Sequence, residues 1–208
     1  MQIKKDIIRN KLKEAGETEF FEKGFERSSV REIAGKAGTT LGNFYNYFKN
    51  KEELFHEVVK NEVIKFEEFF HGHQEEPTEY LIQSEREPAA FYRALDEFND
   101  VLTSVFTRKF YIWVACSKGT QFSNSKDMVI RYIGEHFIGH VRDVGTMIPD
   151  LDNTAAMLSN GFLDGILYIL GNHSDEKTVN DLIKNHLLFF FMGMIGLIEG
   201  FISEVAHD

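Results

Sequence analysis

Apolar residues recur every three or four positions along most of the chain, which is the spacing of amphipathic helices. The first such segment runs from about Ile3 to Lys23 and ends at Gly24. Its predicted inward stripe consists of Ile8, Leu12, Ala15, Gly16 and Phe20. The chain has only three prolines and no run of alternating β-branched residues. The pattern therefore predicts an all-α protein of about nine helices.

The segment from Ser28 to Leu54 predicts short helices that follow one another closely. Ser29 and Glu32 have the spacing of a capping box, in which hydroxyl and carboxylate each accept a backbone N–H at a helix start. The helix that begins there is expected to stop at Gly38, because glycine easily adopts the left-handed conformation at a helix end. Its predicted apolar stripe is Val30, Ile33, Ala34 and Ala37.

Thr39 or Thr40 is expected to cap a second helix directly after this turn. The predicted buried face holds Leu41, Phe44, Tyr45 and Phe48, and the outer face holds Gly42, Asn43, Asn46 and Tyr47. Asn50 and Glu53 repeat the capping pattern for a third, longer helix that begins near Lys51. Two helices joined by so short a turn are typical of a helix-turn-helix, which presents its second helix to the major groove of DNA.

Residues 24–54, GFERSSVREIAGKAGTTLGNFYNYFKNKEEL, resemble the N-terminal DNA-binding module of the TetR family of bacterial one-component regulators. The resemblance implies a helix-turn-helix domain at residues 1–50 and a helical ligand-binding and dimerisation domain at residues 51–208. It implies a dimeric repressor that binds a palindromic operator in double-stranded DNA and is released by a small hydrophobic or aromatic effector. Glu19 departs from the family pattern, since the matching position is usually apolar.

The same resemblance implies which residues approach DNA, with Ser29 and Lys51 on the flanking phosphates. The full set is Ser29, Thr40, Leu41, Gly42, Asn43, Tyr45, Asn46, Tyr47 and Lys51. An asparagine such as Asn43 or Asn46 can pair with an adenine edge. Core packing is the alternative role for Tyr45, because it shares the predicted buried edge with Phe44.

The charge is unevenly distributed along the chain. Residues 1–60 hold 12 basic and 10 acidic residues, net +2, whereas residues 61–208 hold 11 basic and 23 acidic residues, net −12. Attraction to phosphates must therefore depend on individual cations and not on a general basic surface. The candidate cations are Lys4, Lys5, Arg9, Arg27, Arg31, Lys49 and Lys51.

The second part of the chain predicts further helices. The helix from Lys51 should reach about Phe70, a carboxylate-rich loop should follow, and helical spacing resumes at Pro88. The segment RKFYIWVACSKG is apolar nearly all round, which predicts a helix buried in the middle of the second domain. The segment SNSKDMVIRYIGEHFIGHVRDVG, residues 123–145, predicts another long helix, which should end before Pro149.

The last two helices, Asn153 to Leu170 and Glu176 to Val205, each have a strip of small residues where another helix can approach closely. These strips are Gly161 and Gly165, and Gly193, Gly196 and Gly200. Leu187 to Ile198 is uncharged, too apolar for a helix with one exposed face and too short to span a bilayer. We expect a homodimer through these two helices and no membrane insertion, with a purely intrachain core as the alternative.

An apolar effector pocket is the remaining expectation for the second domain. The resemblance places it among the aromatic helices, with Phe91, Phe98, Phe106, Tyr111, Trp113, Phe137, His140 and Asp164 as candidate ligand-binding residues. His71 with His73 and His136 with His140 have metal-compatible spacing, but no cysteine lies near them, and we expect no metal and no cofactor.

Enzymatic activity has no positive signal in the sequence, since no nucleophile elbow, phosphate loop or zinc-protease motif occurs. We therefore expect that the protein is not an enzyme. The single cysteine, Cys116, and a charged N-terminus without an apolar run favour a cytoplasmic protein. The alternative function is a helical small-molecule-binding protein without specific DNA binding.

Overall fold

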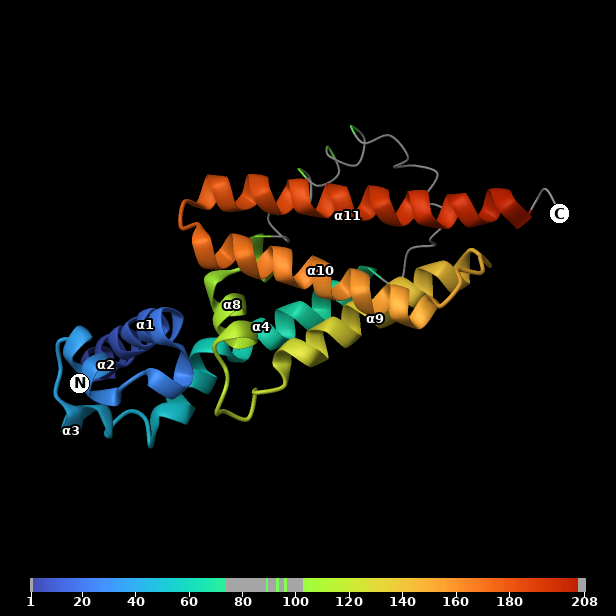
Figure 1. Ribbon diagram of the computed structural model, residues 1–208. Helices are drawn as coiled ribbons and strands as arrows, with labels where there is room; N and C mark the ends of the chain where they lie inside the picture. Colours follow the sequence, from blue (N-terminus) through green and yellow to red (C-terminus); the bar gives the residue numbers. More distant parts are fainter. Residues whose placement is uncertain (1, 74–88, 90–92, 94–95, 97–102, 206–208) are drawn as a thin grey trace. The chain divides into compact units, whose positions relative to one another are not determined.

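The structure is a computed structural model, and it describes residues 2–73, 89, 93, 96 and 103–205. The helices among these residues are α1 (Gln2–Arg27), α2 (Val30–Lys36), α3 (Leu41–Phe44), α4 (Lys51–His73), α8 (Arg108–Ala115), α9 (Ser125–Asp143), α10 (Leu151–Asn172) and α11 (Glu176–Val205). Figure 1 shows them in chain order. The described part of the chain contains no strand, and the all-α prediction is confirmed.

Two compact units make up the fold. The first comprises residues up to Phe66 together with Thr107–Lys126, and the second comprises Glu67–Phe106 and Asp127–Asp208. This division differs from the expected boundary at residues 50 and 51, because the compact unit takes in most of α4 and all of α8. The functional division at residue 50 stays a prediction.

The first unit is built around the contact of α1 with α4. Leu12, Phe20, Leu54 and Phe55 are all fully buried. A Cβ added at Gly16 would lie 2.8 Å from a methyl carbon of Leu54, so this position on α1 requires glycine for the close approach. The predicted inward stripe of the first helix is confirmed except that Ile8 is half-buried. Gly24, at φ 72° and ψ 166°, interrupts the helix where the sequence predicts its end.

The short helix α8 also belongs to the first unit. Phe110, Ile112 and Trp113 have no exposed surface, as the apolar pattern predicts. Their neighbours correct the prediction that this helix lies in the middle of the second domain. The backbone N–H of Phe25 donates to the Cys116 carbonyl at 2.9 Å, and Trp113 packs edge-on against Phe66 of α4. An all-round apolar pattern shows that a helix is buried but not which helices cover it.

The second unit contains α9, α10 and α11. Phe137 and Val141 of α9 form a buried cluster with Ala155 of α10 and Ile198 of α11. The helices α10 and α11 run side by side (Figure 1), and their bounds agree with the predicted last two helices to within about two residues. The predicted small-residue strip explains their close approach, since a Cβ at Gly165 would lie 2.1 Å from the His186 ring.

Candidate nucleic-acid interface

The turn between α2 and α3 is held by backbone hydrogen bonds. The Thr39 N–H donates to the Ala34 carbonyl at 2.9 Å, and the Gly38 N–H donates to the Gly35 carbonyl at 3.0 Å. This pair of bonds is the Schellman pattern, which requires a left-handed residue at the helix end. Gly38 supplies it with φ 68°. The predicted end of α2 is therefore confirmed, together with the physical reason for the glycine.

The start of α2 differs from its prediction. Ser29 is the N-cap residue in an extended conformation, but its side chain makes no capping hydrogen bond. The Glu32 carboxylate pairs instead with Lys23 of α1 at 2.7 Å. The expected capping box is therefore wrong, because the ion pair with a second helix takes the carboxylate away from the Ser29 backbone.

The start of α3 agrees with its prediction, but the helix is shorter. The Thr40 hydroxyl accepts a hydrogen bond from the Asn43 N–H at 3.1 Å. Only Leu41–Phe44 is α-helical, and the Asn46 and Tyr47 N–H groups then donate three residues back, to Asn43 and Phe44. This tighter winding changes which side chains share a face.

The surface of the turn and α3 consequently differs from the predicted arrangement. Phe44 and Phe48 are buried, with 0% and 1% exposure, and hold the segment against the first unit. Leu41 is 41% exposed and Tyr45 is 54% exposed. The prediction that Leu41 and Tyr45 lie on the buried face is therefore wrong, as is the core-packing alternative for Tyr45. Both join the outer face, here defined as Thr40, Leu41, Gly42, Tyr45 and Asn46, all exposed.

The two candidate asparagines are not equivalent. The Asn43 side chain donates to the Thr39 hydroxyl at 2.7 Å and accepts from the Asn46 amide at 3.1 Å. Both functional groups of Asn43 therefore have partners within the protein. Asn46 is exposed, and only one of its two amide hydrogens is used in the hydrogen bond to Asn43. Asn46 is thus the better candidate for a bidentate contact with adenine, and Asn43 orients it.

Lys51 has a different environment from the one predicted. Its ammonium donates to the backbone carbonyls of Phe25 at 2.5 Å and Ser28 at 2.9 Å, and it lies 4.3 Å from the centre of the Phe25 ring. Desolvation by burial lowers the pKa of Lys51, and the nearby Glu26 carboxylate opposes this effect. The expected phosphate contact by Lys51 is not supported, because two carbonyls at the end of α1 already hold the ammonium.

The remaining candidate cations divide into paired and unpaired side chains. Arg9 forms an ion pair with Glu57 at 2.9 Å, and the Arg27 guanidinium donates to the Lys23 carbonyl. Arg31 and Lys49 are exposed, and no ion pair is found for either among the described residues. Arg31 and Lys49 flank the outer face in sequence, which makes them the better candidates for phosphate contacts.

The beginning of α4 agrees with the predicted cap. The Asn50 side-chain oxygen accepts from the Glu53 N–H at 2.8 Å, and the Glu53 carboxylate accepts from the Lys49 N–H at 2.5 Å. These two bonds fix the chain between the outer face and α4. They also hold the exposed Lys49 in a defined position.

Glu19 lies beneath the helix-turn-helix with no exposed surface. Its two carboxylate oxygens contact the ammonium groups of Lys23 at 2.9 Å and Lys36 at 2.8 Å. Burial alone acts to raise the pKa of Glu19, but the ion pairs with Lys36 and Lys23 outweigh it and lower the pKa from 4.5 to about 2. Glu19 therefore joins α1 to the end of α2 as an ion.

Residues 12–58 match the family model described as bacterial regulatory proteins, tetR family. This N-terminal domain is a TetR-family domain. The match includes all of α2 and α3, the Schellman turn between them and the start of α4, so the resemblance inferred from residues 24–54 is confirmed.

Curated proteins resemble this TetR-family domain over similar lengths. The TetC protein of transposon Tn10 from Escherichia coli is 42% identical over 50 residues, which are 24% of this chain and 25% of TetC. The transcriptional repressor KstR2 from Mycolicibacterium smegmatis is 36% identical over 53 residues, which are 26% of each chain. The chain thus spans about a quarter of the length of these curated relatives.

One solved structure has a similar fold over most of its length. It is a Clostridium perfringens protein named for the regulation of fatty acid metabolism, with a TM-score of 0.51 and 21% identity. The similarity covers 86% of this chain and 97% of that chain. It supports the all-α fold beyond the TetR-family domain.

The predicted ligand-binding residues do not gather in one unit. Tyr111 and Trp113 lie in the first unit, where the ring centroids of Tyr111 and Phe21 are 5.1 Å apart. Phe106, Phe137 and His140 are buried in the second unit, and Asp164 is exposed there. Phe91 and Phe98 lie outside the described residues. The effector site stays a prediction.

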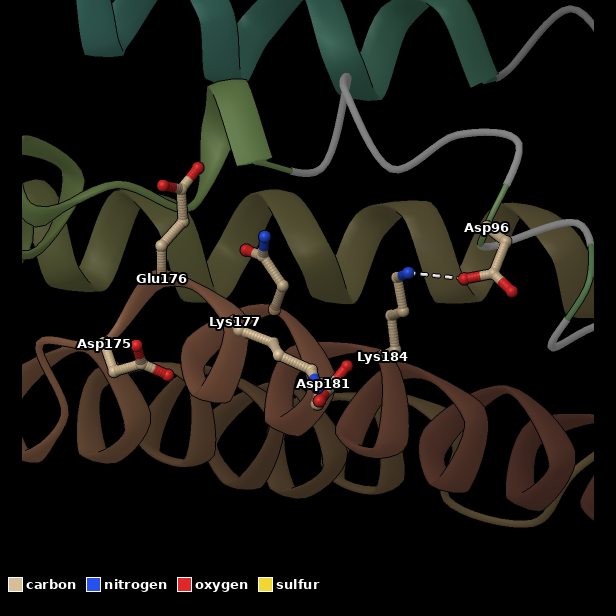
Figure 2. A pocket seen from close by; sticks show the side chains of 7 residues that line it. Asp96, Asp175, Glu176, Lys177, Asp181 and Lys184 are labelled. Carbon is tan, nitrogen blue, oxygen red and sulfur yellow. Dashed lines mark hydrogen bonds and ion pairs between the residues drawn. The ribbon is translucent and has the colours of Figure 1, made fainter.

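Two surface pockets are lined by other residues. The larger, of about 600 Å³, lies in the second unit and is lined by Asp96, Asp175, Glu176, Lys177, Asn180, Asp181 and Lys184. Figure 2 shows these polar side chains and the ion pair that joins Lys184 to Asp96. The smaller pocket, in the first unit, is also polar and is lined by Asn10, Lys13, Glu14, Glu17, Val58 and Lys109. Neither pocket has the apolar lining that was expected.

Cys116 behaves as a core residue. Its side chain is buried, and desolvation raises the pKa of the thiol from 9.0 to about 11. A thiol with so high a pKa is almost wholly protonated at neutral pH and is a poor nucleophile. This agrees with a packing role for Cys116.

Proposed function

We propose that the protein is a DNA-binding transcriptional regulator that reads a palindromic operator with the outer face of its TetR-family domain. The observation that supports this most strongly is the exposed row Thr40, Leu41, Gly42, Tyr45 and Asn46, held from behind by buried Phe44 and Phe48. The exposed Asn46 amide and Tyr45 phenol can contact base edges and phosphates, and the backbone at Gly42 can approach DNA without obstruction by a side chain. Repression is the proposed mode of action.

The proposed regulator acts as a two-fold dimer through α10 and α11. Phe189 of α11 is 73% exposed, and Gly193 and Gly196 follow on the same face with nothing within 4 Å of an added Cβ. Met157 and Tyr168 are exposed on α10 by 66% and 65%. An apolar surface of this kind needs a cover, and a second copy in an isologous contact supplies it.

Membrane insertion is the competing explanation for this apolar surface. By length and composition alone, Glu176–Gly200 can cross a membrane, and only 17% of its most apolar window is buried. The dimer is favoured because Lys184 and Glu199 lie within the same stretch. Burying charged groups in a bilayer is unfavourable.

The effector of the proposed regulator is a small apolar molecule. Trp113 is fully buried, and its indole N–H has no hydrogen-bond partner in the described part of the chain. A buried donor of this kind suits a polar atom of a mostly apolar ligand. Trp113 is the sole tryptophan, so a change in its fluorescence emission on addition of a candidate effector reports binding directly.

Selection of random DNA sequences by the purified protein tests the proposed function. A regulator of this kind enriches an inverted repeat whose half-sites lie about one helical turn, or roughly 34 Å, apart. Failure to enrich any repeat would favour the alternative, a helical small-molecule-binding protein without specific DNA binding. The protein is also proposed to be cytoplasmic and without enzymatic activity.

A further inference from the structure

His136 and His140 lie one turn apart on α9, and their side chains converge. The two Nε2 atoms are 3.0 Å apart, the ring centroids are 4.4 Å apart, and the ring planes make an angle of 80°. His140 is only 6% exposed, whereas His136 is half-buried. His140 is therefore the more buried member of the pair, and part of the His136 side chain is accessible to solvent.

The rotation of α9 that brings these rings together is fixed by its neighbouring face. Phe137 and Val141 each follow one of the histidines and are buried against Ala155 of α10 and Ile198 of α11. A Cβ added at Gly134 would lie 3.2 Å from the Ser159 hydroxyl, which indicates close packing of α9 on α10. The histidine pair is thus held on a rigid scaffold.

The separation of the two ring nitrogens suits a shared metal ion. Imidazole nitrogens lie about 2.0 to 2.1 Å from zinc, so two such ligands are about 3.3 Å apart at a tetrahedral angle and about 2.9 Å apart at a right angle. The distance of 3.0 Å lies between these values. Two histidines four residues apart on one helix face are also the arrangement that places two imidazoles on one zinc in helical sites.

We propose that His136 and His140 bind one divalent transition-metal ion per chain through their Nε2 atoms. Zn²⁺, Ni²⁺ and Cu²⁺ are the suitable ions, because neutral imidazole is a preferred ligand for them. Over the part of the chain that is described, no group of three or more metal-ligating residues occurs. Two imidazoles hold an ion less tightly than the four ligands of a structural site, so we expect the ion to exchange readily.

Direct hydrogen bonding between the rings is the competing explanation. A neutral imidazole has one N–H donor and one acceptor nitrogen, so a single proton shared by the two Nε2 atoms also gives a separation of 3.0 Å. In that case the pair holds no ion. Only metal titration distinguishes the two arrangements.

The test uses full-length protein without an affinity tag, stripped of metal with a chelator and titrated with Zn²⁺ in a calorimeter. One Zn²⁺ should bind per chain and raise the midpoint of thermal unfolding in a concentration-dependent way. His136→Gln and His140→Gln should each weaken this binding by about tenfold or more. A double variant of the other histidine pair, His71→Gln with His73→Gln, is the matched control. It should bind Zn²⁺ as the unmodified protein does.

Nitrogen NMR of the unmodified protein provides a second measurement that does not depend on how the variants fold. Two Nε2 resonances should shift on addition of Zn²⁺. Absence of binding by the unmodified protein, or unchanged binding by both single variants, would overturn the proposal. Loss of binding in the control pair alone would overturn it as well, by assigning the ion to His71 and His73.

Discussion

The Lys51 ammonium donates to the Phe25 carbonyl at 2.5 Å and lies 4.3 Å from the centre of the Phe25 ring. These contacts join the start of α4 to the end of α1, and a further bond to the Ser28 carbonyl extends them to the residue before the α2 cap. Lys51 therefore sets the position of the helix-turn-helix on α4. We therefore expect a structural role for Lys51 and only an indirect effect on DNA binding.

Replacement of Lys51 by methionine tests this role. Lys51→Met keeps an unbranched stem over the Phe25 ring but leaves the Phe25 and Ser28 carbonyls without their donor, so the free energy of unfolding should fall by about 1–3 kcal/mol. Urea denaturation measures the loss. Lys49→Met is the matched control and should leave stability within about 0.5 kcal/mol of the parent.

The salt dependence of DNA binding separates the two roles. Loss of one phosphate contact lowers the slope of log affinity against log salt by about 0.9. Lys49→Met should lower this slope, whereas Lys51→Met should leave it unchanged. The opposite result would be a Lys51→Met variant with an unchanged free energy of unfolding and a lower slope. That result would show that Lys51 contacts a phosphate.

Glu19 should make stability depend on acidity. Its pKa is lowered from 4.5 to about 2 in the folded protein, so its contribution is fully present above about pH 5 and is lost as the pH falls from there towards 2. Glu19→Gln should lower the free energy of unfolding by about 3 kcal/mol at neutral pH. Denaturation curves of both proteins between pH 7 and pH 3 measure the difference. A difference that stays constant over this range would contradict the ionised state of Glu19.

The contact of α10 with α11 depends on Gly165. An added methyl group there would lie 2.1 Å from the His186 ring, whose Nε2 donates to the Phe162 carbonyl at 2.8 Å. Gly165→Ala should therefore displace the ring and destabilise the protein by about 1–3 kcal/mol. In Gly161→Ala the new methyl group would lie at an ordinary 3.6 Å from the Phe190 ring. The midpoint of thermal unfolding should be clearly higher for this control than for Gly165→Ala. Equal midpoints would contradict the close packing of Gly165 against His186.

The proposed dimer predicts the effect of a charge on the exposed face of α11. Phe189 is 73% exposed in the single chain, so Phe189→Lys should leave the fold intact but dissociate the dimer. Sedimentation velocity measures the change, and Ile64→Lys, at an exposed position on α4, is the control. A monomeric parent protein, or a Phe189→Lys variant that stays dimeric, would contradict the proposed interface.

Local features of the fold could be predicted from the sequence, because their partners lie within a few residues. The Thr40 and Asn50 caps and the left-handed Gly38 are of this kind. The capping box at Ser29 failed because Glu32 has a partner nine residues away. The contacts of Lys51 could not be predicted for the same reason, since its carbonyl partners lie 26 and 23 residues earlier.

Periodicity was a less certain guide to the outer face and to α8. The winding tightens after Phe44, which moves Tyr45 from the predicted buried face to the exposed one. The apolar segment around Trp113 was correctly predicted to be buried, but nothing in its pattern specifies α1 and α4 as its neighbours. The spacing of His136 and His140 was visible in the sequence, whereas the convergence of their ring nitrogens depends on side-chain conformation.

Operator affinity of an Asn46→Ala variant tests the central claim most directly. Asn46 is exposed on the outer face and has an amide hydrogen available for a base edge, and its removal should not affect packing. Fluorescence anisotropy with the selected operator and with a scrambled duplex measures discrimination between the two. We predict a loss of about 1–3 kcal/mol in this discrimination, with unfolding unchanged. Discrimination equal to that of the parent protein would contradict the assignment of this face to operator recognition.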